Sequence, residues 1–99
     1  MTELTHWSLV DSDEKFVVDK KSKLRLAGFV SNDPRFKKNS YIITSEIISS
    51  DGRSFITSSG THYYVLGAPE EAWVVFCEIN GWKIDPENVF ENNLSHKNI

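Results

Sequence analysis

Cysteine, proline and glycine are scarce in this sequence, and it has no long apolar run. Its 99 residues include one Cys, three Pro and five Gly. One Cys cannot form an intramolecular disulfide, and it excludes zinc sites built on several cysteines. No apolar run approaches the ~18 residues that a membrane span needs. The first residues lack the basic and apolar stretches of a secretion signal, so we expect a soluble, cytoplasmic protein without membrane contact.

The length and composition predict one small folded domain. A chain of 99 residues has room for one domain but not for two. Hydrophobic residues make up 39% and aromatic residues 12% of the sequence, which is not the composition of a disordered chain. We therefore expect a single domain over residues 1–99, with an ordered core over residues 4–94 and a frayed tail over residues 95–99.

The charge is distributed unevenly along the chain, although its formal net value is only −3. Residues 1–14 contain four acidic side chains and no basic one, residues 15–38 contain eight basic against two acidic, and residues 39–99 contain three basic against eight acidic. If the basic segment 15–38 forms one contiguous face, it creates a positive potential on an acidic body. Such a face would contact phosphate or an acidic partner. The alternative is a solvated surface whose charges oppose those of the remainder.

Residues 41–66 predict a three-stranded antiparallel meander. The segments 41–49, 53–57 and 61–66 are rich in strand-forming side chains, and turn-forming residues separate them. The first turn is Asp51-Gly52, a strong hairpin signal because a tight type I′ turn needs positive φ at both central positions. A Ser-Ser-Gly sequence supplies the second turn.

The expected register of the meander places apolar side chains on both faces of the sheet. A two-residue turn at the Asp-Gly sequence would pair Ile48 with Phe55, and a three-residue second turn would pair Phe55 with Tyr63. These three side chains would share one face, with Ile47 and Ile56 on the other. A sheet that is apolar on both faces needs cover on both. The cover would be a curled barrel, a packed helix or a second copy of the chain, so a homodimer is one expectation.

Shorter strands precede the meander. Residues 5–10 are rich in strand formers, and residues 23–31 alternate in the manner of a half-buried strand. The segment 15–19 predicts a further strand, with a short helix over residues 12–20 as the alternative. Gly28 falls where an inward side chain is expected, which indicates a bulge or a close backbone approach.

Helix signals follow the meander. A Gly-Ala-Pro-Glu-Glu sequence precedes residue 72, and Pro and acidic side chains are favoured where a helix starts. Asn80-Gly81 suits its end, so residues 72–79 predict a helix, with a strand as the alternative because several side chains are β-branched. An Asp-Pro-Glu sequence predicts a second short helix over residues 85–94.

The order of strands before helices predicts an α+β fold. We expect a strongly bent antiparallel β-sheet or a small open β-barrel, built from the meander over residues 41–66 and the N-terminal strands. One or two C-terminal helices would follow this sheet.

Four short motifs lie in order between residues 29 and 67. They are Pro34-Arg35-Phe36, Thr44-Ser45-Glu46-Ile47, Thr57-Ser58-Ser59-Gly60-Thr61-His62-Tyr63 and Leu66-Gly67. In these motifs the segment resembles small uncharacterised β-rich domains of bacteria and their phages, although the last motif comes later than in that pattern and indicates an inserted residue near Tyr64. The resemblance implies a compact β-rich unit from a phage or mobile element, and that family has no established activity to carry over.

Residue patterns typical of catalysis and metal binding are missing from the sequence. His6, His62 and His96 are far apart, with no second His or Cys at ligand spacing, so we expect no metal site and no cofactor. Cys77 lies in an apolar run, where a thiol is usually buried and inert. A pair of Cys77 with His62 is the remaining catalytic alternative, and spacing does not support it. We therefore expect that the protein is not an enzyme.

The loop predicted over residues 31–40 is the segment that we expect to bind a partner. Turn-forming residues surround Pro34, and a loop of about ten residues is long for so small a domain. Trp, Tyr and Arg dominate binding hot spots, and Trp82 is the tryptophan that we expect to be partly exposed. The predicted partner-binding residues are Arg25, Arg35, Phe36, Lys37, Lys38 and Trp82.

The leading functional hypothesis is a small non-enzymatic protein that binds another protein. A phage- or mobile-element-encoded accessory, such as an inhibitor of host defence or an immunity-type partner, is the setting that we expect. The alternative is a module that binds single-stranded nucleic acid through the basic segment, where Phe16, Phe29 and Phe36 would stack on bases. The acidic pI of about 5.5 argues against this alternative.

Overall fold

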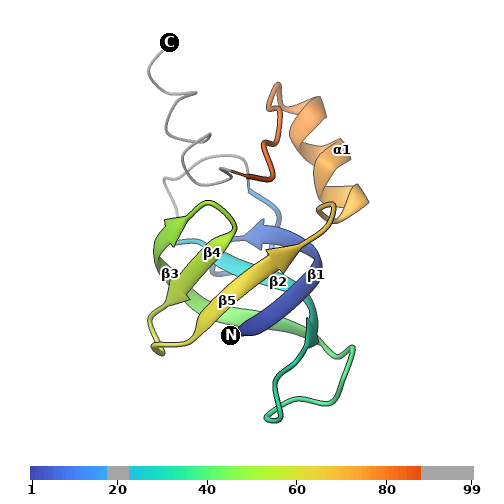
Figure 1. Ribbon diagram of the computed structural model, residues 1–99. Helices are drawn as coiled ribbons and strands as arrows, with labels where there is room; N and C mark the ends of the chain where they lie inside the picture. Colours follow the sequence, from blue (N-terminus) through green and yellow to red (C-terminus); the bar gives the residue numbers. More distant parts are fainter. Residues whose placement is uncertain (18–22, 88–99) are drawn as a thin grey trace.

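Five strands precede one helix in the computed structural model, which describes residues 1–17 and 23–87 (Figure 1). The strands are β1 (Thr2–Val10), β2 (Arg25–Ser31), β3 (Tyr41–Asp51), β4 (Ser54–Thr57) and β5 (His62–Leu66), and the helix is α1 (Glu71–Ile79). The predicted α+β fold is confirmed, and so is the three-stranded meander. The segment after the meander is a helix rather than the alternative strand.

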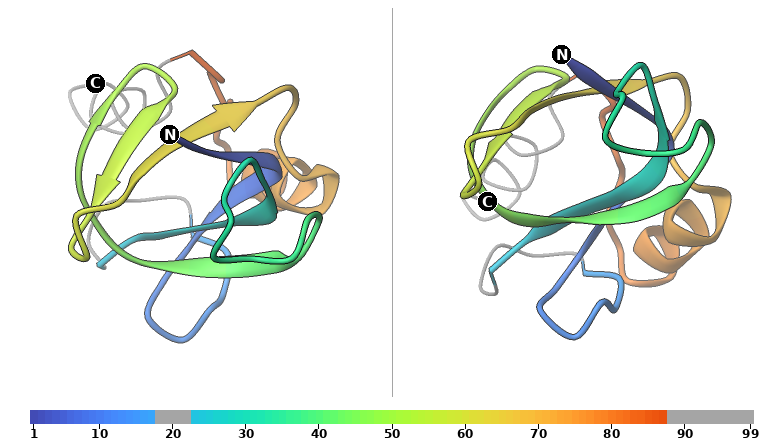
Figure 2. Two further views of the ribbon diagram at one scale, coloured as in Figure 1. Left: turned by 60° about the horizontal axis from the view of Figure 1, so that its bottom comes forward. Right: turned by 90° about the horizontal axis from the view of Figure 1, so that it is seen from below.

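The five strands form a hydrogen-bonded ring in which each strand pairs with the next (Figure 2). The four successive pairings are antiparallel. An odd number of strands in such a ring leaves the first and the last running in the same direction. Accordingly, β1 pairs with β5 in parallel, from Thr2 opposite Tyr63 to Thr5 opposite Leu66. The predicted strong bend is confirmed, and the parallel pair closes the ring, although shifts of register keep the barrel irregular.

The ring bends where β1 passes Gly28. The register between β1 and β2 shifts between Thr5 and Ser8, and His6 has a φ of 49° in this bulge. A Cβ atom on Gly28 would lie 3.0 Å from the Thr5 carbonyl oxygen and 3.3 Å from the Cα atom of Trp7. The close backbone approach predicted for Gly28 is therefore confirmed, because no larger residue fits without displacing the backbone of β1.

The turn between β3 and β4 lies one residue later than predicted. Asp51 pairs with Ser54, so the two loop residues are 52 and 53 rather than 51 and 52. Gly52 has a φ of 62° and occupies the first loop position. The Asp-Gly sequence therefore predicted the turn correctly, but it did not determine which two residues form its centre.

A bulge at Ile48 decides which side chains of β3 face the core. The register between β3 and β4 shifts between Ile47 and Ser49, which leaves Ile48 as the extra residue. Ile47 is buried with Phe55 and Tyr63, whereas Ile48 is 63% exposed. The predicted pair of Ile48 and Phe55 is wrong: the later turn places Phe55 opposite Ser50, and the extra residue of the bulge turns Ile47 rather than Ile48 toward the core. The predicted pair of Phe55 and Tyr63 is confirmed.

Helix α1 packs at one end of the ring, and two tryptophans join them (Figure 1). The ring centroids of Trp73 on α1 and Trp7 on β1 are 5.7 Å apart. The indole N–H of Trp7 donates to the carbonyl of Gly67 at 3.2 Å, and that of Trp73 donates to the carbonyl of Val17 at 3.1 Å. Both indoles are thus buried without a lost hydrogen bond. The buried hydrophobic core consists of Leu4, Trp7, Leu9, Leu24, Leu26, Val30, Ile47, Phe55, Tyr63, Val65, Trp73, Cys77 and Trp82.

The ends of α1 lie close to their predicted positions. The Glu70 carboxylate caps the N-terminus, where it accepts a hydrogen bond from the backbone N–H of Ala72 at 3.2 Å. Asn80 is the C-cap, and Gly81 follows with a φ of 80°. The predicted stop at Asn80-Gly81 is confirmed, since glycine adopts this left-handed conformation without a steric penalty.

Some expectations fall on residues that the structure does not describe. Residues 85–87 end in a turn, and the remainder of the predicted second helix and the predicted frayed tail lie outside the described residues. Residues 11–17 form turns and one isolated bridge, and the rest of the strand or helix predicted there also lies outside. The single-domain organisation stays a prediction. Within residues 1–17 and 23–87, no helix is long and apolar enough to cross a bilayer.

Candidate partner-binding surface

The described basic residues of the segment 15–38 lie toward the two opposite ends of β2. The seven residues of β2 span about 20 Å, given a rise of ~3.3 Å per residue. Lys15 and Lys23 precede β2 in the chain. Lys15 stays near the start of β2, because its neighbour Phe16 forms a bridge with the last residue of β1, which itself pairs with the first residue of β2. Lys37 and Lys38 follow β2 at its other end. Within the described part of this segment, the positive charge is therefore divided into two groups rather than gathered on one face.

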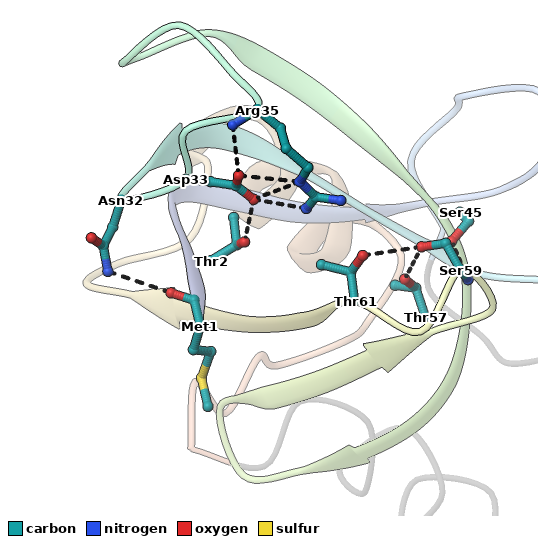
Figure 3. A network of polar contacts seen from close by, with 9 residues as sticks. All are labelled: Met1, Thr2, Asn32, Asp33, Arg35, Ser45, Thr57, Ser59 and Thr61. Carbon is teal, nitrogen blue, oxygen red and sulfur yellow. Dashed lines mark hydrogen bonds and ion pairs between the residues drawn. The ribbon is translucent and has the colours of Figure 1, made fainter.

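The loop that follows β2 is anchored through one carboxylate. We name residues 32–40 the mouth loop, because it crosses the end of the ring opposite α1 (Figures 1 and 2). The Asp33 carboxylate accepts hydrogen bonds from the Thr2 hydroxyl and from Nη2 of Arg35 at 2.7 Å (Figure 3). It also accepts from the backbone N–H of Arg35 at 2.9 Å and from its Nε at 3.1 Å. These bonds tie the loop both to itself and to β1.

The same contacts set the ionisation of the Asp33–Arg35 pair. Hydrogen bonds from the Arg35 guanidinium, and then from Thr2, hold the pKa of Asp33 well below its usual range. The pKa of Arg35 is raised, chiefly by the hydrogen bond to Asp33. The Asp33 side chain is 6% exposed, whereas that of Arg35 is 55% exposed. Arg35 therefore presents a fixed guanidinium to solvent, with its charge balanced by Asp33.

The remaining residues of the mouth loop divide into buried and exposed ones. Phe36 is half-buried against the core, and the Cζ atom of Arg35 lies 5.3 Å from its ring centroid. Lys37 and Lys38 are exposed. The Ser40 N–H donates to the Lys37 carbonyl at 3.0 Å, which closes a turn around the lysines. The structure thus brings together four of the six predicted binding residues.

Arg25 and Trp82 lie elsewhere. Arg25 begins β2 and is the register partner of Glu46 on β3, at the end of β2 away from the mouth loop. Trp82 is 8% exposed and belongs to the core, so its predicted partial exposure is wrong. The backbone N–H of Trp82 donates to the Cys77 carbonyl at 2.8 Å. This hydrogen bond turns the chain back toward α1, where the indole is buried. A hollow of about 580 Å³ lies beside it, between α1 and residues 81–86.

Three aromatic side chains on neighbouring strands form an exposed cluster that we name the aromatic face. It consists of His6, Phe29 and Tyr41, from β1, β2 and β3. Phe29 and Tyr41 are direct cross-strand partners whose ring centroids are 5.3 Å apart, and His6 lies 6.0 Å from Phe29. Phe29 is 36% exposed and Tyr41 is 52% exposed. Of the three side chains, only Phe29 is expected from the sequence to contact a partner, because only the register of the folded sheet joins the rings.

The aromatic face borders the mouth loop. The backbone N–H of Asn39 donates to the Val30 carbonyl on β2 at 2.8 Å. Asn39 also lines a hollow of about 290 Å³ together with Thr5, His6 and Phe29. Lys37 and Lys38 immediately precede this asparagine in the chain. The basic part of the mouth loop and the aromatic rings are therefore neighbouring parts of one surface.

Acidic side chains influence Tyr41. Burial raises the pKa of the Tyr41 hydroxyl, and Glu70 and Glu14 raise it further, while a hydrogen bond with Ser8 lowers it. Negative charge therefore faces Tyr41, whereas the lysines of the mouth loop adjoin Asn39. The surface is consequently not uniformly basic.

A row of hydroxyl groups lies at the end of the ring that the mouth loop crosses (Figure 3). Ser59 Oγ is 3.2 Å from the side-chain oxygens of Ser45, Thr57 and Thr61. The backbone N–H of Ser59 also donates to Ser45 Oγ at 3.2 Å. These contacts tie the turn between β4 and β5 to β3. They fit the structural role that hydroxyls at turns commonly have, namely to bond nearby polar groups.

The catalytic alternative of Cys77 and His62 is not supported by their positions. Cys77 is fully buried on α1, and burial raises the pKa of its thiol to about 11. His62 begins β5 and is exposed, at the end of the ring opposite α1 (Figure 1). The structure therefore does not bring these two side chains together.

Comparison with protein-family models, with curated proteins and with solved structures finds no match for this chain. The resemblance of residues 29–67 to phage and bacterial domains accordingly stays a prediction.

Proposed function

We propose that the chain is a small non-enzymatic domain that binds another protein through the mouth loop. The observation that carries this proposal is the anchoring of the loop at Asp33. Five hydrogen bonds from Thr2 and Arg35 to the Asp33 carboxylate hold the loop backbone and the Arg35 guanidinium in place. A phage- or mobile-element-encoded accessory, acting as a host-defence inhibitor or as an immunity-type partner, is the setting that we propose.

A fixed loop favours binding because part of the ordering cost is met during folding. Immobilising a flexible side chain at an interface costs about 0.5–1.5 kcal/mol, and a loop without fixed backbone costs more. Arg35 is already held by Asp33, and its 55% exposure leaves it accessible to a partner. Lys37 and Lys38 add exposed positive charge, which steers association with an acidic surface.

The test compares two double variants that change the charge equally. Lys37→Glu/Lys38→Glu reverses the charge of the mouth loop, and Lys15→Glu/Lys23→Glu reverses two exposed lysines at the other end of β2. Affinity purification from the native host followed by mass spectrometry identifies the partner, and titration calorimetry then measures its affinity. We expect the first variant to lose the partner and the second to retain it. Equal affinity of the wild type and the mouth-loop variant would sink the proposal.

Binding of single-stranded nucleic acid is the second candidate function. Exposed Phe29 and Tyr41 beside Lys37 and Lys38 favour it, because such proteins combine aromatic side chains with a basic track. It requires an affinity for oligothymidylate that falls steeply as salt increases. Absence of binding at low salt would remove this candidate.

A further inference from the structure

The aromatic face has properties that suit a protein side chain better than a nucleobase. The ring planes of His6 and Phe29 meet at 90°, and those of Phe29 and Tyr41 meet at 66°. Successive bases of a single strand stack on ring faces that are presented side by side. Rings that meet edge to face do not present such a row of parallel faces.

The hollow at this face has the size of a side-chain pocket. It measures about 290 Å³ and is lined by Thr5, His6, Phe29 and Asn39. Small-molecule sites usually enclose roughly 300–1,000 Å³ and bury most of their ligand, so this shallow hollow is at the lower limit for them. One apolar side chain, inserted as an anchor, is the occupant that its volume and lining favour.

Charge around the face restricts the chemistry of the segment that would carry this anchor. Lys37 and Lys38 are exposed beside Asn39, and they complement acidic residues of a partner. On the other side, Glu70 and Glu14 act electrostatically on Tyr41. A polyanion that crossed the whole face would therefore meet negative charge near Tyr41, whereas a peptide can place its acidic residues only beside the lysines.

We propose that the aromatic face takes one large apolar side chain of an acidic protein segment, whose carboxylates pair with Lys37 and Lys38. This inference rests on the proposed protein-binding function and names the chemistry of the partner. It also gives the strained backbone of His6 a role, because the bulge with φ of 49° turns this ring toward Phe29.

A library of short random peptides, panned on the immobilised full-length chain, tests the inference. We expect the recovered peptides to combine Asp or Glu with one aromatic or large aliphatic residue. The affinity of a selected peptide should fall at least about tenfold for Tyr41→Ser and for His6→Asn. Asparagine tolerates the positive φ at residue 6, so the second variant removes the ring without straining the bulge. Ile48→Ser is the matched control, since Ile48 is also an exposed large apolar residue of β3 but lies outside the face.

The outcomes separate this inference from the proposed function. If Lys37→Glu/Lys38→Glu abolishes peptide binding but Tyr41→Ser and His6→Asn do not, the mouth loop binds proteins and the aromatic anchor site is wrong. If all three variants bind as the wild type does, both proposals are wrong. Recovery of basic peptides, of no peptides, or a tighter binding of oligothymidylate that needs Tyr41 would also overturn the inference.

Discussion

Arg53 links three segments of the fold, and its removal should be costly. Its Nη1 donates to the carbonyls of Val65 at 2.9 Å and of Gly67 at 3.1 Å, and its Nε donates to the Glu87 carboxylate at 2.8 Å. The turn between β3 and β4 is thereby joined to the end of β5 and to the segment after α1. The Arg53 side chain is 16% exposed, whereas that of Glu87 is 70% exposed.

The two kinds of contact differ in expected free energy. A hydrogen bond from a charged donor contributes roughly 1.5–3 kcal/mol, and an exposed ion pair contributes about 0–1 kcal/mol. We therefore expect Arg53→Met, which keeps most of the apolar stem, to lower the free energy of unfolding by about 3 kcal/mol through the two carbonyl contacts. Glu87→Gln should lower it by less than about 1 kcal/mol, because the ion pair that it weakens is exposed.

Equilibrium unfolding in urea measures both variants, provided that their m-values match that of the wild type. Arg53→Lys is a useful third variant. A lysine keeps the charge, but its single ammonium lacks the planar fork with which the guanidinium reaches two carbonyls and a carboxylate at once. An equal loss of stability in Glu87→Gln and Arg53→Met would show that the two carbonyl contacts do not dominate. An Arg53→Lys variant as stable as the wild type would contradict the need for a guanidinium.

Three further predictions concern ionisation and burial. Because the pKa of Asp33 is lowered on folding, its contribution to stability is complete above its unfolded pKa of about 4 and is lost as the pH falls toward the folded value. The gap in unfolding free energy between the wild type and Asp33→Asn should thus be constant near neutral pH and shrink in acid; a gap independent of pH would contradict this. Cys77 should resist thiol reagents at pH 8 until urea is added, and rapid labelling of the folded protein would contradict its burial. Acrylamide should not quench the fluorescence of Trp82 in the folded protein, because its side chain is 8% exposed. Fluorescence quenching that is present in the folded wild type and absent from Trp82→Phe would contradict this burial.

Local signals in the sequence were sufficient for most elements of the fold. The meander and the helix with its Asn80-Gly81 end depend on neighbouring residues, whose conformational preferences are visible in the chain. At Gly28 the missing side chain in an alternating strand indicated the close approach, although the backbone that it meets belongs to β1. Register was not predictable in the same way. The turn after Asp51 is displaced by one residue and Ile48 bulges, and both depend on which face of β3 the closed ring buries.

The candidate site was only partly predictable for a related reason. Arg35, Phe36, Lys37 and Lys38 share a loop, so sequence proximity placed them together correctly. The aromatic face joins residues from three strands, and only the pairing of β1, β2 and β3 brings them into contact. The position of Trp82 between Gly81 and Lys83 predicts partial exposure, but the hydrogen bond from its backbone N–H to the Cys77 carbonyl turns the chain so that the indole is buried.

Closure of the ring by its first and last strands has a consequence for the rate of folding. The contacts at this seam join residues far apart in the chain, such as Trp7 and Gly67, which are separated by 60 positions. The entropy of closing so large a loop is lost before the parallel pair stabilises the chain. We therefore expect the antiparallel hairpins to form early and the seam last, so that substitutions within Thr2–Thr5 accelerate unfolding more than they slow refolding.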